Sequence, residues 1–447
     1  MNYAMVLYIL GYICNVEALL MLLPLGVGLL YGESVGDTFG LTIVLLFAVG
    51  AVLTRKRPKK QTFYAKEGFV TVSLCWIVMS LFGALPLSLS GEVGSYVDCF
   101  FEIVSGFTTT GASVVANVEI LSQNILFWRS FTHWIGGMGV LVFILCLLPL
   151  TGGYHMNLMK AESPGPSVSK LVPKVQSTAK ILYTIYIILT IVEIIFLLIG
   201  KMPLFDTLCL SFGTAGTGGF GIKNDSIASY STYNQVVITV FMILFGINFN
   251  AYYLLLTKKV MQAAKNEEVR YYLGIIGLAI VAIAINTREM FTSFGRAFQQ
   301  AAFQVGSIIT TTGYATTDFN VWPVFSKTIL VILMFVGACA GSTGGGIKVS
   351  RLLILCKSAR KELQLYLHPN AVKKIKMDDK AIPHEVVRAT NMFLFVYIMI
   401  FVTSLLIISL DNLDMVSNFT AIAATLNNIG PGLGAVGPTG NFNTYSY

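Results

Sequence analysis

Long hydrophobic runs alternate with short polar connections along most of this chain. Runs close to the ~20 residues that cross a bilayer predict transmembrane helices. The pattern therefore predicts an all-α polytopic membrane protein. Nine spans are expected, roughly at residues 5–30, 38–54, 67–89, 125–150, 180–200, 233–257, 271–290, 325–355 and 390–410.

The composition agrees with this pattern. Of the 447 residues, 55% are hydrophobic and only 12% are charged. A soluble domain has about 25% charged residues, which cover its surface. The composition therefore excludes a soluble enzyme, a secreted module and a disordered protein, and makes the lipid bilayer the main surrounding of the chain.

The net charge of +8 is unevenly distributed. Basic residues gather in four connections, within 55–66, 160–180, 258–270 and 351–388, whereas acidic residues dominate the alternate connections. Lys/Arg-rich loops stay cytoplasmic, so the alternation predicts a cytoplasmic N-terminus. The basic stretches lack an aromatic-basic module, so we expect them to set topology and not to bind nucleic acid.

Four shorter apolar stretches share one plan, in which a half-length helix is followed by a turn of small residues. A helix of ten residues is ~15 Å long, about half the hydrocarbon layer, so each stretch is expected to re-enter the membrane without crossing it. Asp98, Asp206 and Ser417 lie 13 residues before the turn glycine and are predicted N-caps, while Gln300 breaks the pattern in the third unit. The chain is thus predicted to hold four parallel repeats.

The turns predict a cation site. Non-helical backbone at membrane depth must be buried or line water, and its carbonyl oxygens can replace the hydration shell of a cation. Each half-helix also directs its partially negative C-terminal end into the membrane. The alternative interpretation is that these glycines only permit tight turns. Four such turns in register favour the cation site over that alternative. The expected ligands are the carbonyls of Thr109, Thr110, Gly111, Thr217, Gly218, Gly219, Thr311, Thr312, Gly313, Asn428, Ile429 and Gly430.

The eighth span contains a run of glycines that predicts a break in its helix. Each interior glycine costs about 1 kcal/mol relative to alanine. We expect the unwound segment to border the pore and act as a gate; the alternative is a close-packing helix surface, with Lys348 extending to the inner interface. The predicted gate comprises Gly341, Ser342, Thr343, Gly344, Gly345, Gly346 and Lys348.

Other candidate features are given structural roles. His133 is expected to be a packing histidine, with pH sensing as the alternative. Glu193 lies inside the fifth span, and the hypothesis for it is an ion pair with a basic residue of a neighbouring helix. The seven cysteines have no CxxC spacing and are interpreted as small buried hydrophobes. Gly216–Gly221 fits GxGxxG but follows a half-helix where a dinucleotide site requires a strand.

Five motifs stand in order along nearly the whole chain: SGFTTTGA at 105–112, HWIGGMG at 133–139, AGSTGGGIKV at 340–349, HPNAV at 368–372 and ATLNNIGPG at 424–432. Together they resemble the Trk/Ktr/HKT superfamily of potassium transporters, and within it the TrkH/TrkG-type membrane subunits. The two spans before the first repeat favour that branch over the shorter Ktr subunit.

The resemblance implies potassium uptake across a prokaryotic inner membrane, with K⁺ as the transported ion and no bound cofactor. It also implies a homodimer and a cytoplasmic TrkA-type nucleotide-binding (RCK) regulatory ring. The family plan includes a last inner helix after the fourth turn, which this sequence is expected to lack. The expected units are two N-terminal helices at 1–60 and pore repeats at 61–160, 161–265, 266–375 and 376–447.

Two other functional classes, a coupled symporter and an intramembrane enzyme, predict different sequence features. A sodium- or proton-coupled cation symporter predicts side-chain ligands at the midplane and inverted repeats, whereas the units here all begin from the same side. An intramembrane enzyme needs clustered catalytic side chains at membrane depth, whereas the intramembrane ionisable residues are few and scattered. The sequence thus favours a potassium pore and no enzymatic activity.

Overall fold

The computed structural model describes residues 1–34, 36–58, 64–137, 139, 175–369 and 374–446. Regular structure in these residues is helical, apart from one antiparallel hairpin of β1 (Lys376–Met377) and β2 (Lys380–Ala381). The predicted all-α class is confirmed. Some predicted features lie outside the described residues. They are Met138 and residues 370–372 of the five motifs, Cys146, and most of the second basic stretch.

Six helices or helix pairs among the described residues are long and apolar enough to cross a membrane. Their outward faces carry exposed leucine, isoleucine and phenylalanine side chains, as expected for contact with lipid. They are α1 (Tyr3–Leu20) with α2 (Leu22–Leu30), η1 (Gly36–Gly40) with α3 (Leu41–Thr54), α4 (Ala65–Gly83) with α5 (Leu85–Ser90), α10 (Val175–Ile199), α15 (Glu267–Asn286), and α19 (His384–Ile408) with η5 (Ser409–Asp411).

Three predicted spans take other forms. The sixth is not one straight helix but a pair, α12 (Thr232–Phe245) and α13 (Phe249–Leu256), bent by 90°. Asn248 starts the second helix, because its side chain accepts a hydrogen bond from the Asn250 amide. The described part of the fourth predicted span is α7 (Gln123–Gly137), and the rest of that span, apart from Gly139, lies outside the described residues. The eighth is divided into α17 (Val324–Val336) and α18 (Val349–Leu367), as its glycines predicted.

Four re-entrant pore helices are present where half-length helices were predicted: α6 (Tyr96–Phe107), α11 (Leu204–Gly216), α16 (Phe294–Ile309) and α20 (Met415–Leu426). Shorter elements complete the connections. They are η2 (Val118–Ile120), α14 (Val260–Ala264), η3 (Arg288–Met290), η4 (Phe319–Val321), η6 (Gly434–Val436) and η7 (Phe442–Thr444).

The predicted N-caps of the pore helices are wrong by one turn. The observed caps are Ser95, Pro203, Ser293 and Asp414, so that Asp98, Asp206 and Ser417 lie at the third helical position. Asp98 still serves the helix start, because its carboxylate accepts a hydrogen bond of 2.7 Å from the Ser95 amide in a capping box. Gln300 lies within α16, which begins further upstream than the other pore helices.

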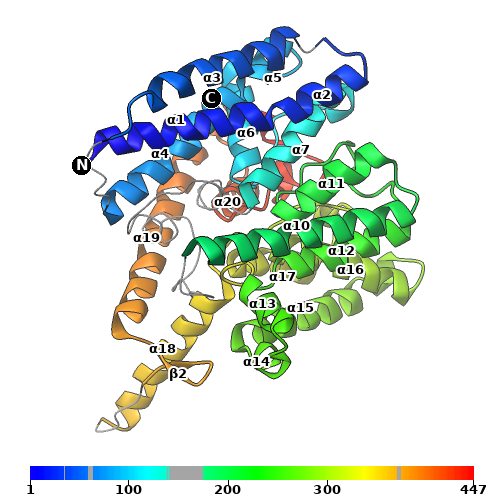
Figure 1. The fold of residues 1–447 in the computed structure, drawn as a ribbon. Helices are drawn as coiled ribbons and strands as arrows, with labels where there is room; N and C mark the ends of the chain where they lie inside the picture. The colour runs from blue at the N-terminus through cyan, green and yellow to red at the C-terminus, as the bar shows by residue number, and fades with distance from the viewer. Residues whose placement is uncertain (35, 59–63, 138, 140–174, 370–373, 447) are drawn as a thin grey trace.

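The helices pack around three hydrophobic clusters. One joins the two N-terminal spans to α6 and α7, a second joins α15, α16, α17 and α20, and a third joins α10, α11 and α12. In Figure 1 the blue N-terminal helices lie along the first repeat, and α20 lies among the other pore elements near the middle of the molecule. The pore helices are thereby held from the side by transmembrane helices of their own and neighbouring repeats.

Candidate functional site

All four pore helices end in the same backbone motif. One residue in each turn has left-handed angles: Thr109 (φ 57°), Thr217 (φ 53°), Thr311 (φ 59°) and Asn428 (φ 58°). The amide of the following residue donates to the carbonyl five residues earlier, at 2.8 Å in every repeat. These are the bonds of a Schellman motif, so four stretches with different sequences leave the helix in the same direction.

The turn glycines lie two residues after these left-handed positions. Gly111, Gly219, Gly313 and Gly430 have φ angles of 74°, 79°, 85° and 93°, a region in which a side chain is strained. Space excludes a side chain as well. A Cβ on Gly219 would lie 1.8 Å from the carbonyl oxygen of Thr312, in the next repeat.

These close approaches follow one another around a closed ring. A Cβ on Gly111 would lie 1.9 Å from the Gly218 oxygen, and one on Gly313 would lie 1.9 Å from the Ile429 oxygen. A Cβ on Gly430 would lie 3.0 Å from the Gly111 oxygen, which returns the sequence to the first repeat. Each turn thus contacts the next in the order one, two, three, four, one. The four predicted turns therefore converge on one centre.

Backbone oxygen is the ligand type that this centre offers. None of the four turns contains an ionisable side chain. Thr110 Oγ1 donates to the amide oxygen Oδ1 of Asn428 at 3.0 Å and so joins the first turn to the fourth. Among the residues that the structure describes, no group of three or more His, Cys, Asp or Glu side chains is placed to hold a metal ion. The chemistry available at the ring is therefore coordination by neutral oxygens.

A buried ion pair that no sequence pattern predicted braces the first two turns. The Glu102 carboxylate on α6 accepts from Arg129 Nε on α7 at 2.9 Å and from the Val114 amide at 3.1 Å. The Arg129 guanidinium lies 4.3 Å from the ring centroid of Phe220, just after the second turn. Ionisable residues inside apolar segments are costly, and this charge in an apolar setting is the one sequence signal that the pair leaves.

His133 and Glu193 are two further buried ionisable residues. The His133 ring stacks on Phe220 at 4.2 Å, and its Nδ1 accepts from the Phe220 amide at 3.5 Å. It fills the space behind Gly218, where a Cβ would meet the ring at 2.3 Å, as expected of a packing residue. Glu193 is fully buried, and no ion pair among the described residues includes it, so its pairing with a basic residue stays a prediction.

The glycine-rich segment between α17 and α18 lies against the third and fourth turns. The Gly345 amide donates to Thr311 Oγ1 at 2.5 Å, and the Gly346 amide donates to the Asn427 carbonyl at 3.1 Å. A Cβ on Gly344 would lie 2.8 Å from the Thr310 oxygen. The segment, called the gate loop below (residues 337–348), therefore abuts the inner side of the ring.

Lys348 is folded back into the gate loop. Its side chain is only 3% exposed, and its ammonium group donates to the Gly344 carbonyl. An extended lysine that reaches the membrane interface was the alternative, and this contact excludes it. The ammonium group instead closes the loop on itself.

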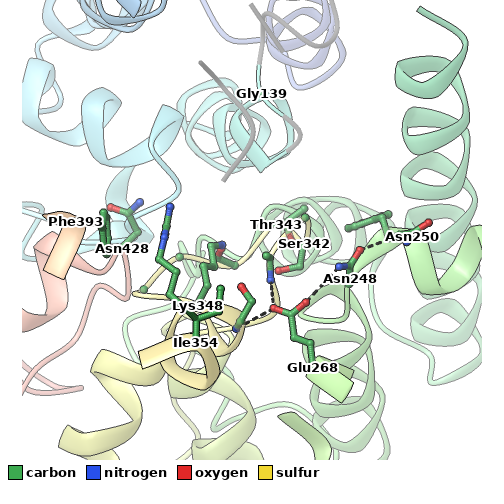
Figure 2. A pocket seen from close by; sticks show the side chains of 18 of the residues that line it. Gly139, Asn248, Asn250, Glu268, Ser342, Thr343, Lys348, Ile354, Phe393 and Asn428 are labelled. Atoms are coloured by element: carbon green, nitrogen blue, oxygen red, sulfur yellow. Dashed lines mark hydrogen bonds between the residues drawn. The ribbon is translucent and has the colours of Figure 1, made fainter. Parts of the chain in front are cut away.

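A cavity of about 870 Å³ lies beside the gate loop. Its lining runs from Thr109 and Asn428 of the ring, past Gly341 to Lys348, to Asp378 of the hairpin. Figure 2 shows Asn428, Lys348 and Glu268 around this space. The cavity thus extends from the ring, along the gate loop, to the hairpin, which lies with α18 at one end of the molecule (Figure 1).

Comparison with known proteins agrees with this arrangement. A family model described as "TrkH: Cation transport protein" matches residues 36–447. The chain belongs to the TrkH family. It is 37% identical over 446 residues to the Trk system potassium uptake protein TrkH of Vibrio parahaemolyticus, and 35% identical over 443 residues to that of Salmonella typhimurium. In both cases the match covers 98% of this chain and 92% of the relative.

A solved structure shows that the similarity extends to three dimensions. The crystal structure of the potassium transporter TrkH from Vibrio parahaemolyticus matches with a TM-score of 0.87 at 35% identity, covering 98% of this chain and 92% of that one. The similarity to the TrkH/TrkG branch inferred from the five motifs is thus confirmed, and so is the architecture of pore-loop repeats.

Proposed function

We propose that this TrkH-family chain takes up potassium ions across the cell membrane through the ring of four turns. The closed cycle of contacts from Gly111 to Gly430 is the observation that carries this proposal. A neutral ring of oxygens suits a large monovalent cation, whose hydration shell such oxygens replace. The relatives named as potassium uptake proteins support the choice of ion.

The proposed ligands are backbone carbonyls from three consecutive residues of each turn. The Schellman bonds hold these residues in one conformation, so that each repeat offers its oxygens in an equivalent way. The C-terminal ends of the four pore helices add a partial negative charge that favours a cation over an anion. The set is Thr109–Gly111, Thr217–Gly219, Thr311–Gly313 and Asn428–Gly430.

The gate loop is proposed to close the pore below this ring. Its contacts with Thr311 and Asn427 support that role, because they place it against the two turns at their inner side. Its active part is proposed to be Gly341 to Gly346 with Lys348. Water and ions then pass only when the loop leaves this position.

The assembly around the pore is proposed from the family. A homodimer with a cytoplasmic TrkA-type nucleotide-binding ring fits the "Trk system" in the names of the relatives. In Figure 1, α14, α18 and the hairpin, which lie in two of the basic stretches, gather at one end of the molecule. We assign that end and the N-terminus to the cytoplasm of a prokaryotic cell, with the chain in its inner membrane. The units 1–60, 61–160, 161–265, 266–375 and 376–447 remain the proposed division.

Two measurements test the proposal. Expression should restore growth at low potassium in a cell that lacks its own uptake systems, and purified protein in vesicles should carry ⁸⁶Rb⁺ or K⁺ in preference to Na⁺. Deletion of Gly341 to Gly346 should raise that flux, because the loop no longer closes the pore. Absence of flux from both the parent and the deletion variant would contradict the proposal. Flux that stops when a sodium or proton gradient is removed would favour the coupled symporter.

A further inference from the structure

Glu268 holds both ends of the gate loop with one carboxylate. Its Oε1 accepts from the Ala340 amide at 2.6 Å and from the Ser350 amide at 3.1 Å. The first amide precedes the glycine run and the second lies in the first turn of α18. Glu268 belongs to α15, is 2% exposed, and lines the cavity beside the loop.

This arrangement fixes the distance between the loop ends. Residues ten apart in a continuous helix are separated by about 15 Å along its axis. Here the amide nitrogens of Ala340 and Ser350 both lie within 3.1 Å of the same oxygen atom. Any movement that separates the two ends, and so draws the loop out of the pore, must break at least one of these bonds.

A third bond extends the contact to another repeat. Glu268 Oε2 accepts from Asn248 Nδ2 at 3.3 Å, as Figure 2 shows. Asn248 lies in the bend between α12 and α13, and the next amide, of Phe249, donates to the Gly341 carbonyl at 3.0 Å. The bend of the second repeat, the start of α15 and the gate loop therefore meet at this carboxylate.

The helical turn that carries Glu268 is itself fixed. The Glu267 amide donates to Asp378 of the hairpin at 2.7 Å, and the Glu267 carboxylate accepts from Lys357 of α18 at 2.5 Å. The Glu268 side chain is thus presented to the loop from an anchored backbone. The Glu268 carboxylate therefore accepts from the Ala340 and Ser350 amides while its own helical turn is fixed. A side chain held in this way can fix the position of the loop.

We propose that Glu268 is the positioning residue that pins the gate loop in its closed position. The proposal rests on the proposed function, since it requires that the loop close a cation pore. Glu268 touches the loop and not the ring, so it sets how often the pore is open and not which ion passes. Loss of the carboxylate should therefore raise flux and leave the preference for K⁺ over Na⁺ unchanged.

The test is ⁸⁶Rb⁺ flux into vesicles that hold the full chain without a regulator, with Na⁺ competition as the second readout. Hydrogen bonds to a charged group are strong enough that losing them should raise the flux of Glu268→Ala roughly tenfold. Glu268→Gln should give a smaller rise, because its amide oxygen still accepts from Ala340 and Ser350. Asn248→Asp leaves Glu268 in place and can still cap α13, but it sets a second carboxylate against that of Glu268. Repulsion between the two carboxylates should weaken the contact, so this variant should also raise flux.

Glu289→Gln is the matched control, because this acid follows the far end of α15 and its side chain is 84% exposed. The deletion of Gly341 to Gly346 serves as the fully open reference. If the deletion variant conducts and the flux of folded Glu268→Ala does not exceed that of the parent, the proposed role of Glu268 is refuted. The proposed pore function is then unaffected. A rise that abolishes the K⁺ preference would also refute the role of Glu268, because the leak would then arise from a damaged ring. No flux from any variant would refute the proposed function itself.

Discussion

The ring and the gate loop are both non-helical segments inside a membrane protein, and they are held in opposite ways. Each turn of the ring is fixed by hydrogen bonds to its own pore helix, repeated at 2.8 Å in all four repeats. The gate loop occurs once and is held by other elements, through backbone bonds to Asn427 and Phe249 and through the side chains of Glu268 and Thr311. Bonds within one helix end make a rigid ligand frame, whereas bonds to distant elements, some of them through single side chains, make a segment that a substitution can loosen.

The largest expected effect comes from filling the ring. Gly219→Ala would place a Cβ 1.8 Å from the Thr312 oxygen, at a φ of 79° that disfavours a side chain. Flux in vesicles should fall to background, because the turns must separate. Gly277→Ala on the exposed face of α15, where nothing lies within 4 Å, should keep the parental flux. Normal flux through the Gly219 variant would show that the turns do not carry the ion.

The next effect is on stability. Removal of one member of a buried ion pair costs about 3–5 kcal/mol, since the other charge is left without its partner. Arg129→Met should therefore lower the thermal unfolding temperature in detergent strongly, and Arg129→Met with Glu102→Gln should recover part of the loss. Arg288→Gln breaks a pair whose side chains are 66% and 84% exposed, and should leave the temperature almost unchanged. Equal temperatures for the Arg129 and Arg288 variants would argue against the brace.

A smaller effect is expected at the contact between ring and gate. Thr311→Val removes the hydroxyl that accepts from the Gly345 amide. The loss of one hydrogen bond, worth about 0.5–1.5 kcal/mol, should raise basal flux roughly two- to tenfold. Thr328→Val, on the exposed face of α17, is the control for the same chemical change. Unchanged flux would mean that this bond does not hold the loop.

The smallest effect concerns the start of α20. The Asp414 carboxylate accepts from the Ser417 hydroxyl and amide, and these bonds lower its pKa. A lowered carboxyl pKa contributes stability that is present above the ordinary carboxyl pKa and is lost as the pH falls through the lowered value. Asp414→Ala should cost about 1 kcal/mol near neutral pH, and the difference from the parent should shrink in acid. A difference that is constant with pH would contradict the capping role.

The turns were predictable because their constraint is local. A left-handed residue followed two positions later by a close-packed glycine leaves a short signature, with threonine at the left-handed position in three turns and asparagine in the fourth. The break of the eighth span left a similar signature in its glycines. The bend at Asn248, in contrast, lies inside a stretch whose overall hydropathy predicts one span at 233–257. The N-caps were misplaced because Asp98 and Ser417 are good capping residues that lie one turn inside their helices.

The residues that support the site were less visible. Glu102 and Arg129 are 27 positions apart, and Glu268 is 72 positions from Ala340, so no local pattern joins them. The one sequence feature that distinguishes Glu102, Arg129 and Glu268 from their neighbours is a charged side chain within or beside an apolar segment. The partners of such groups are fixed by helix packing, which hydropathy and turn signatures do not describe.

The central claim is that four turns form one cation site, and anomalous scattering from crystals grown in Rb⁺ or Tl⁺ tests it most directly. The account predicts anomalous density at the centre of the ring, within coordination distance of carbonyl oxygens from the turns ending at Gly111, Gly219, Gly313 and Gly430. Crystals that diffract well but hold these ions only elsewhere, with an empty ring, would contradict it.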